Sequence, residues 1–322
     1  MDMIMIDGLS FAMPLLVMAI GGIYCERSGV TMLALEGLQG FGAFTGSAVA
    51  ILCAVKTGGA GSASPWIIYI AMAASMAGGL AFSLIHAALC VKFRAQQVIS
   101  GAVVNTLAVA LTTFFTSIIN LGLTGEASNK FQIGVAGRFT VPVLSRIPVL
   151  GGLFKNMYPF EIVILVIAFI AWYLLYRTPY GLRLRSCGEN PASLDAAGGD
   201  VAKTRLGAVM ICGALSGLGG IFLAYSISAT FSPSIYMGYG YLSIAALIFG
   251  NWKILPTFAV CLFFGFAKSS GYQLCLFLGM SSSFSDLLLV LPYVLTLLLL
   301  IFFSKHNRPP RALGEFFDKG KR

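Results

Sequence analysis

Residues Leu206–Ser228 read LGAVMICGALSGLGGIFLAYSIS, an apolar run interrupted only by small and hydroxyl-bearing residues. The run carries no charged side chain and exceeds the ~20 residues that an α-helix needs to cross the hydrocarbon core of a bilayer. Within a bilayer, the backbone N–H and C=O groups of such a segment must pair with one another, which a helix achieves. This stretch therefore predicts a transmembrane helix and sets the fold class of the chain.

The composition of the whole chain supports this prediction. Of its 322 residues, 58% are hydrophobic and 10% are charged, and the mean hydropathy is +0.88. A soluble domain carries roughly 25% charged residues, so the composition excludes a soluble enzyme and a disordered or fibrous chain. The net charge of +9 does not indicate a nucleic-acid partner, because in a membrane protein the placement of positive residues matters more than their sum.

Nine apolar stretches lie along the chain. They run over Gly8–Tyr24, Val30–Val55, Pro65–Val91, Val98–Leu123, Tyr158–Leu175, Leu206–Ser228, Gly240–Gly250, Leu255–Leu276 and Phe284–Phe303. We expect an all-α, polytopic membrane protein with about nine transmembrane helices (eight to ten fit the apolar content), forming a single transmembrane domain over residues 1–322. Gly240–Gly250 is too short to cross the bilayer unless it extends into its flanks.

The Lys and Arg residues predict the orientation, because cytoplasmic loops are enriched in them. With the N-terminus outside and the C-terminus inside, fifteen lie in inner loops and five in outer loops. This topology makes 124–157 an extracytoplasmic loop, in which we expect short surface helices. It makes 177–205 a cytoplasmic loop and 304–322 a cytoplasmic tail.

The loop 177–205 contains start and stop signals for a short helix. The Asn190 side chain can cap the first turn, and Pro191 suits the first helical position. Gly198 can adopt the left-handed conformation that ends a helix. A helix of about two turns is marginal in water, so it either docks on another surface or is an ordinary surface turn.

Ionisable residues within spans are costly and indicate function. Glu36 either contacts a substrate, pairs with an Arg such as Arg27, or caps a half-helix. Lys268 can instead extend its ammonium group towards the membrane surface. Glu36 lies in the Gly-interrupted region Glu26–Gly42, and Tyr236–Pro256 is a second broken region. Paired broken segments in the two halves of a chain point to an internal inverted repeat with a site near the midplane.

A stripe of small and polar residues follows helical spacing along the span that begins at Gln97, at positions 97, 100, 101, 105, 109, 112 and 116. Such a stripe serves either interhelical hydrogen bonds or an aqueous path. With nearby aromatic residues it would suit a neutral polar ligand that carries an aromatic ring. The candidate substrate-path residues are Glu36, Gln39, Gln97, Ser100, Asn105, Phe231 and Tyr236.

The sequence gives no sign of an enzyme. It has no GxxxxGK[ST] phosphate loop, so we expect no ATPase site of its own. Neither His86 nor His306 has a partner at metal-ligand spacing, and the seven cysteines are scattered singly. We therefore expect no metal and no cofactor.

Four motifs occur in order along nearly the whole chain. They are Glu26-Arg27-Ser28-Gly29-Val30 with Leu35-Glu36-Gly37, Gln97-Val98-Ile99-Ser100-Gly101 with Asn105, Gly181-Leu182-Arg183-Leu184-Arg185 and Gly188-Glu189-Asn190-Pro191 with Ala196-Ala197-Gly198, and Leu247-Ile248-Phe249-Gly250 with Trp252. Together they resemble the ABC-transporter permeases for nucleosides, the kind paired with basic-membrane-protein-type binding lipoproteins. The wider superfamily includes branched-chain amino acid and ribose permeases.

The resemblance implies a transport subunit of the bacterial cytoplasmic (inner) membrane, the shorter of two related permeases that form a heterodimer. A separate ABC ATPase would dock inside, and an extracytoplasmic lipoprotein would deliver the nucleoside. The short helix would be the coupling helix that contacts the ATPase. The residues implied in coupling are Glu189, Asn190, Pro191, Ser193, Leu194, Ala197 and Gly198.

Two other functions compete with a nucleoside importer. A permease of the same fold could carry a sugar or a branched-chain amino acid, although the spans offer almost no charge partners for an amino acid. A proton- or sodium-coupled secondary carrier could use Glu36, and it would transport without an ATPase.

Overall fold

The computed structural model describes residues 2–56, 65–134, 137–140, 156–277 and 307–318, together with Val294. Seven of its helices are long and apolar enough to cross a membrane. They run over Ile4–Arg27, Leu35–Lys56, Trp66–Lys92, Gln97–Leu123, Pro159–Arg177, Val201–Ser228 and Ile254–Leu274. The prediction of a mainly helical, polytopic chain is confirmed.

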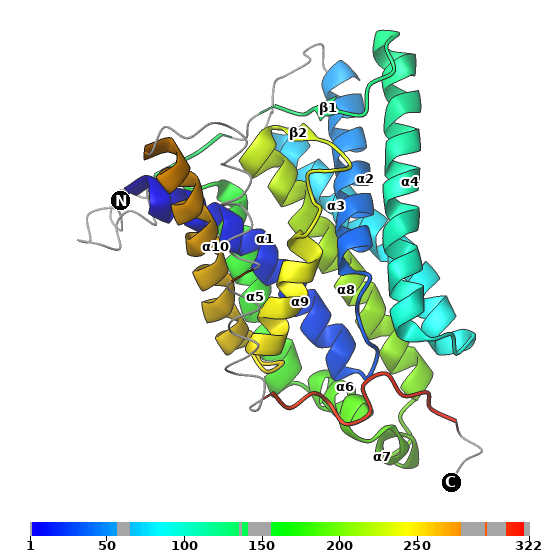
Figure 1. Ribbon diagram of the computed structural model, residues 1–322. Helices are drawn as coiled ribbons and strands as arrows, with labels where there is room; N and C mark the ends of the chain where they lie inside the picture. The colour runs from blue at the N-terminus through cyan, green and yellow to red at the C-terminus, as the bar shows by residue number, and fades with distance from the viewer. Residues whose placement is uncertain are drawn as a thin grey trace.

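Ten α-helices and two short strands make up the described chain (Figure 1). The helices are α1 (Asp2–Arg27), α2 (Leu35–Lys56), α3 (Pro65–Ala87), α4 (Gln97–Thr124), α5 (Pro159–Arg177), α6 (Pro179–Glu189), α7 (Pro191–Ala196), α8 (Val201–Leu223), α9 (Tyr239–Phe249) and α10 (Ile254–Phe277). Short π-helical turns extend α3 over Ala88–Lys92 and α8 over Ala224–Ser228. The strands are β1 (Phe131–Gln132) and β2 (Thr230–Phe231), which pair antiparallel.

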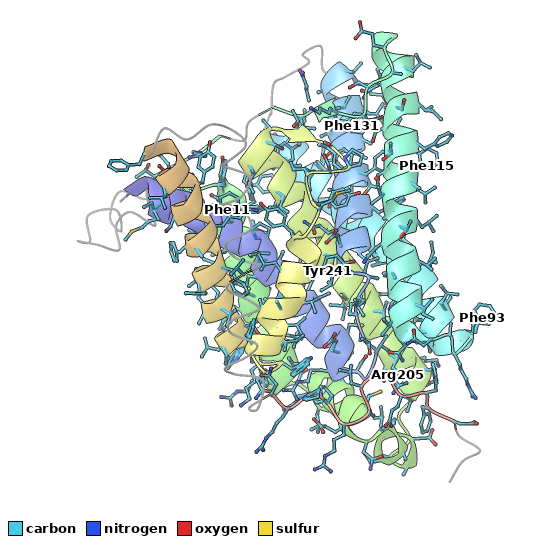
Figure 2. All side chains as sticks on the ribbon, in the orientation of Figure 1. Phe11, Phe93, Phe115, Phe131, Arg205 and Tyr241 are labelled. Carbon is cyan, nitrogen blue, oxygen red and sulfur yellow. The ribbon has the colours of Figure 1, made fainter. Side chains whose placement is uncertain are left out.

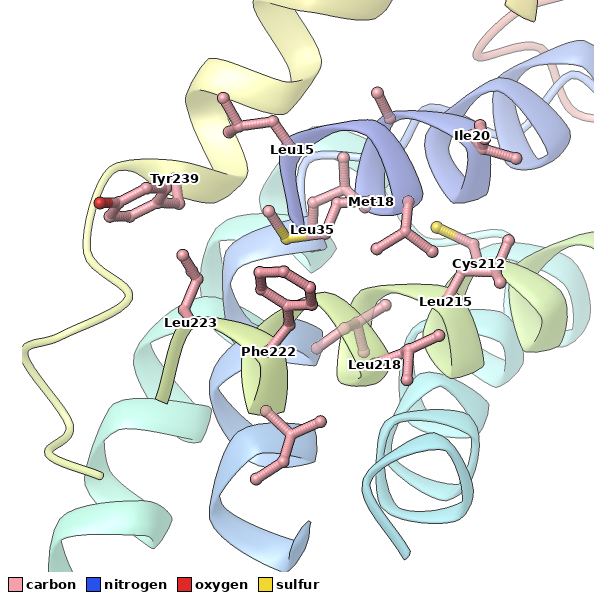
Figure 3. Close-up of a cluster of buried hydrophobic side chains, with 14 of the residues drawn as sticks. Leu15, Met18, Ile20, Leu35, Cys212, Leu215, Leu218, Phe222, Leu223 and Tyr239 are labelled. Carbon is pink, nitrogen blue, oxygen red and sulfur yellow. The ribbon is translucent and has the colours of Figure 1, made fainter. Parts of the chain in front are cut away.

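Helix α8 lies at the centre, packed against α1, α2 and α3. Small residues allow the backbones to approach closely: a Cβ on Gly42 of α2 would collide with the Cα of Gly217 of α8. In lipid, helix association depends on such close van der Waals packing, because lipid tails remove the hydrophobic driving force between helices. Figure 3 shows part of this core, where Met18 of α1 packs with Leu215 and Phe222 of α8.

The first broken region differs from the apolar stretch Val30–Val55. The chain is not helical between Arg27 and Leu35, so α2 begins five residues later than the hydropathy predicts. Gly29 has a φ of +92°, which glycine adopts at little cost. Side chains replace the missing helical bonds: Gln97 Oε1 accepts from the Thr31 N–H at 2.6 Å, and Glu26 Oε1 accepts from the Met32 N–H at 3.3 Å.

The second broken region contains the half-helix α9. It has 11 residues, which gives a length of about 16 Å at 1.5 Å per residue, too short to cross a bilayer. An irregular segment from β2 leads into it, and a tight turn at 250–253 leads from it into α10 (Figure 1). The two broken regions lie against each other, since α9 packs on α1 and α2.

Some predictions fall on other parts of the chain. The ninth apolar stretch, Phe284–Phe303, lies outside the described residues except for Val294, so the number of nine spans stays a prediction. The short helices expected in 124–157 also fall largely outside them. The described part of that loop instead contributes β1 and an isolated bridge between Phe139 and Met157.

The two ends of the bundle differ. Helix α7 and residues 307–318 lie at one end, and β1 and β2 lie at the other (Figure 1). Residues 307–318 run across the ends of the helices: the Gly314 N–H donates to the Gly29 carbonyl at 3.0 Å, and the Ala312 N–H donates to the Gly188 carbonyl at 2.8 Å. We call residues 307–318 the tail segment.

Candidate functional site

An open groove of about 670 Å³ lies along α4 beside the start of α2. Its lining residues are Glu36, Asn105, Thr106, Val109, Ala110, Thr113 and Phe114. All of them belong to helices predicted to span the membrane, and four are polar. Polar side chains facing hydrocarbon are costly, so the presence of Glu36 and Asn105 favours contact of this groove with water or with another protein surface.

Asn105 is the centre of the groove wall and joins three elements. Its Oδ1 accepts from the Gly37 N–H at 2.7 Å, while its Nδ2 donates to the Leu33 carbonyl at 2.9 Å and the Tyr241 hydroxyl at 3.2 Å. Figure 2 shows Tyr241 on α9. The amide therefore fixes the broken start of α2 to α4 and brings a tyrosine to the edge of the groove.

Glu36 also faces the groove, and it caps a half-helix. Its Oε2 accepts a hydrogen bond from the N–H of Gly238, at the start of α9, at 3.0 Å. A carboxylate at a helix N-terminus is favoured by the helix dipole and the unpaired N–H groups there. Of the alternatives drawn from the sequence, capping is observed, whereas Arg27 pairs with Glu189 at 3.8 Å.

The polar stripe on α4 is mainly a packing face. Gln97 and Ser100 are buried, at 3% and 4% exposed. Gln97 binds the Thr31 backbone, and the Ser100 hydroxyl lies 2.9 Å from His86 Nδ1. These two candidate residues therefore lie at the foot of α4, away from the groove lining.

Several groove residues are not part of the predicted stripe, because they lie on the neighbouring face of α4. Thr106, Ala110, Thr113 and Phe114 line the groove, and Phe114 is 59% exposed. A helical period gives the direction of a face but does not say which neighbour covers it, so the sequence held no signal that separates the two faces.

The aromatic candidates lie in the core. Phe231 and Tyr236 are 0% and 1% exposed and stack with ring centroids 6.4 Å apart. The Tyr236 hydroxyl lies 3.2 Å from Thr112 Oγ1. Both residues support the groove helices from behind and do not line the groove.

Gln39 is buried, with none of its surface exposed. Neither atom of its amide has a hydrogen-bond partner among the residues that the structure describes. An unpaired buried amide is costly, so Gln39 lowers the stability of the described fold compared with an apolar residue of the same size. It is not part of the groove lining.

Lys268 does not extend towards a membrane surface, in contrast to the expectation from the sequence. Its ammonium group donates to the Tyr239 hydroxyl at 2.5 Å and lies 5.2 Å from the ring centroid of Phe11. The lysine therefore points inward and joins α10 to α1 and α9.

The short helix of the 177–205 loop is present as α7. The Asn190 side chain accepts from the Ser193 N–H at 3.2 Å, Pro191 occupies the first turn, and Gly198 has a φ of +80°. Its exposed surface consists of small residues: Ala192, Ser193, Ala196, Ala197 and Gly198.

Leu194, for which the resemblance implies a contact with an ATPase, has a side chain that is only 4% exposed and packs with Cys187, Val201 and Phe317. Its apolar side chain is buried within the chain, where it holds α7 to the foot of α8.

Within the described ranges, no group of three or more His, Cys, Asp or Glu residues could hold a metal ion. The polar groups of the groove are amide, hydroxyl and carboxyl groups that suit hydrogen bonding to a small polar molecule.

Comparison with known proteins shows the family of the chain. The family model described as "Branched-chain amino acid transport system / permease component" matches residues 4–303. The guanosine ABC transporter permease protein NupQ of Bacillus subtilis is 39% identical over 318 residues, covering 98% of this chain and 96% of the relative. The nucleoside ABC transporter permease protein NupC of Lactococcus lactis is 35% identical, covering 100% of this chain and 98% of the relative.

The ribose import permease protein RbsC of Escherichia coli is more distant, at 27% identity over 58% of this chain and 53% of the relative. No solved structure gives a significant match. The chain is thus a multi-pass membrane protein that belongs to the family of permease components of branched-chain amino acid transport systems.

Proposed function

We propose that this chain is a permease subunit of an ATP-driven importer for nucleosides, with the groove on α4 as its part of the substrate path. In this proposal the N-terminus lies outside and the end that carries α7 lies inside. A separate ATPase binds α7, a binding lipoprotein delivers the substrate outside, and a second related permease pairs with this chain.

The observation that carries the proposal is an open groove within the spanning region that combines four polar lining residues with apolar ones. Its amide, hydroxyl and carboxyl groups can exchange hydrogen bonds with the hydroxyls and ring nitrogens of a nucleoside. The exposed ring of Phe114 and the nearby Tyr241, 46% exposed, offer aromatic surface for a base. The full-length relatives whose names specify guanosine and nucleosides support this choice of substrate.

The exposed surface around the groove supports a second permease. Helix α4 lies at the edge of the bundle (Figure 1), and its outward face carries the exposed side chains Val103, Phe114, Phe115 and Ile118. A related subunit against this face would cover the groove and turn it into a closed path. Polar groups lining such a path would face water and substrate, which removes the cost of exposing them to lipid.

Helix α7 supports docking of an ATPase. It is capped at both ends and anchored inward by Leu194, and it presents a surface of small residues that a partner can approach closely. We propose that Glu189, Asn190, Pro191, Ser193, Ala197 and Gly198 form or shape this contact.

The experiment is uptake by the whole complex in proteoliposomes. The permease pair, ATPase and binding protein are reconstituted together, and labelled guanosine is supplied outside with ATP inside. We expect uptake that requires ATP and falls when unlabelled adenosine or uridine competes, but not when ribose, glucose or leucine competes.

If ribose, glucose or leucine lowered the uptake and unlabelled nucleosides did not, the permease would carry a sugar or an amino acid instead of a nucleoside. Uptake by this chain without the ATPase, driven by a proton or sodium gradient and abolished by Glu36→Gln, would instead establish a secondary carrier.

A further inference from the structure

The two broken regions are connected at both ends of α9. At its N-terminal end, Glu36 accepts from the Gly238 N–H, and Tyr241 bonds to Asn105 in the groove wall. At its C-terminal end, the Trp252 indole N–H donates to Glu26 Oε2 at 2.5 Å. Both carboxylates come from the chain on either side of residues 28–34, so one broken segment holds both ends of the other.

The Glu26–Trp252 contact is buried and unusual. Each side chain is 5% exposed. The carboxyl group of Glu26 accepts from the indole N–H and from the Met32 backbone N–H, and no salt bridge to Glu26 occurs among the described residues. A buried carboxyl group held only by neutral donors is costly compared with a hydrophobic pair of the same size. This cost argues that the Glu26–Trp252 contact serves to position the end of α9.

The backbone at Trp252 is also strained. Asn251 and Trp252 have φ values of 52° and 53°, in the left-handed region that bulky side chains avoid. Such strain persists only where the surrounding contacts fix it, and it concentrates at functional sites. Here the fixed turn sets the direction in which the indole leaves the end of α9.

The same turn is joined to the loop 177–205, which the proposed function makes the coupling loop. The Arg27 guanidinium donates through Nε to the Trp252 carbonyl at 3.1 Å. Its Nη1 lies 3.8 Å from Oε1 of Glu189, the residue before the N-cap of α7. The backbones also touch, since a Cβ on Gly188 would collide with the Arg27 carbonyl. A shift of the 188–190 turn therefore acts directly on Arg27 and Trp252.

The other end of α9 is equally close to the groove. A Cβ on Gly240 would lie 2.6 Å from the Cα of Glu36, so the backbone of α9 touches the start of α2. A helix of about three turns is stiff over this length. The Trp252 N–H donates to the Leu247 carbonyl within α9 at 3.0 Å, so a rigid shift of α9 from this end would also move Gly238 and Tyr241, beside Glu36 and Asn105.

We propose that Glu26 and Trp252 are positioning residues that fasten α9 to the coupling loop, so that α9 carries motion from α7 to the groove. This inference rests on the proposed function, because it assigns a route between the docking helix and the substrate path.

The test uses the complete reconstituted complex and measures nucleoside transported per ATP hydrolysed, together with KM for the nucleoside. Trp252→Phe keeps the apolar ring and removes the N–H donor. The matched control is Trp172→Phe on α5, the same change where the indole stacks on Phe169 with centroids 6.0 Å apart. We expect Trp252→Phe to lower the transport ratio roughly tenfold, which corresponds to about 1.4 kcal/mol, the size expected for one lost hydrogen bond. The KM of Trp252→Phe for the nucleoside should stay unchanged. The transport ratio of Trp172→Phe should stay at the wild-type value.

Glu26 provides a second pair of variants. Glu26→Gln keeps the volume and an oxygen acceptor, so its transport ratio should stay near the wild-type value, whereas Glu26→Leu should lower it. This pair of variants is the test if Trp252→Phe does not assemble. Equal ratios in Glu26→Gln and Glu26→Leu, a wild-type ratio in Trp252→Phe, or an effect on KM alone would overturn the inference. A wild-type complex that hydrolyses ATP without moving nucleoside would reject the proposed function instead.

Discussion

The side chain of Asn105 joins the broken start of α2 to the wall of the groove. Its amide satisfies the Gly37 N–H and the Leu33 carbonyl, two backbone groups that the break between α1 and α2 leaves without helical partners. The same amide bonds to Tyr241 at the groove edge. A loss of transport on replacing Asn105 would therefore not by itself identify a substrate contact.

Two substitutions separate these roles. Asn105→Leu leaves two backbone groups unpaired, at about 1–3 kcal/mol each, and should lower both thermal stability and uptake. Thr113→Val changes a half-buried groove hydroxyl that donates to the Val109 carbonyl of its own helix, so the fold should survive. We expect its KM for nucleoside to rise about fivefold, measured by uptake at varied substrate concentration. An unchanged KM would remove Thr113 from the substrate path.

Cys187 offers a chemical probe of the loop 177–205. Burial raises the pKa of its thiol above the ordinary value of 9.0, although Arg205 nearby opposes the shift. The thiolate is the reactive form, so maleimide should label Cys187 at pH 8 more slowly than it labels an unfolded peptide of the same sequence. Because the folded pKa is raised, this thiol contributes stability below pH 9 that is lost as pH rises through the folded pKa. Peptide mass spectrometry measures the label, and rapid labelling in the folded protein would contradict the buried position.

At the scale of elements, α7 has one face turned inward and one turned outward. Leu194 fills a small apolar cluster with Cys187 and Val201, whereas Ala192 and Ala196 are exposed. A bulky residue on the outer face should hinder docking without disturbing the loop, and a charge on the inner face should disturb the loop itself.

Ala196→Trp should therefore reduce transport and ATPase binding, while the permease keeps its thermal stability. Leu194→Asp places an unpaired charge in an apolar cluster and should lower thermal stability and expose the loop to protease. Co-purification of the ATPase and a melting curve distinguish the two. Normal ATPase binding by Ala196→Trp would argue that the partner docks elsewhere.

The sequence predicts elements well where one local property decides them. Apolar length predicts the long helices, and the Asn190, Pro191 and Gly198 signals predict α7, because each depends on a few consecutive residues. The inward direction of Leu194 and the buried state of Gln39 depend on residues far away in the chain. The late start of α2 has the same origin, since Gln97 and Asn105 supply partners that the sequence of α2 does not reveal.

For the whole molecule, the tail segment completes the end that carries α7. Arg205 is buried, with only 5% of its surface exposed. It donates through Nη1 to the Glu315 carbonyl at 2.8 Å and through Nε to the Ser28 carbonyl at 3.3 Å. Figure 2 marks Arg205 at this end of the bundle. Arg94 and Asp318 form a further, exposed ion pair at 3.5 Å. One guanidinium therefore connects the tail segment with the first broken region.

Removal of the chain from residue 307 onward should loosen this end. It breaks backbone hydrogen bonds at Gly29 and Gly188 and the Arg205–Glu315 bond, which together contribute about 2–4 kcal/mol. It also uncovers Cys187, which packs near Phe317. We expect a lower Tm and faster maleimide labelling of Cys187. Wild-type labelling after truncation would show that the tail segment does not cover the loop.

The position of the tail segment also sets an order of events during synthesis. Ribosomes deliver the chain from its N-terminus, so Gly29, Gly188 and Arg205 are all made long before the residues that bind them. The end that carries α7 therefore lacks these backbone hydrogen bonds until translation has passed residue 312, and it is complete only once residue 318 has been made.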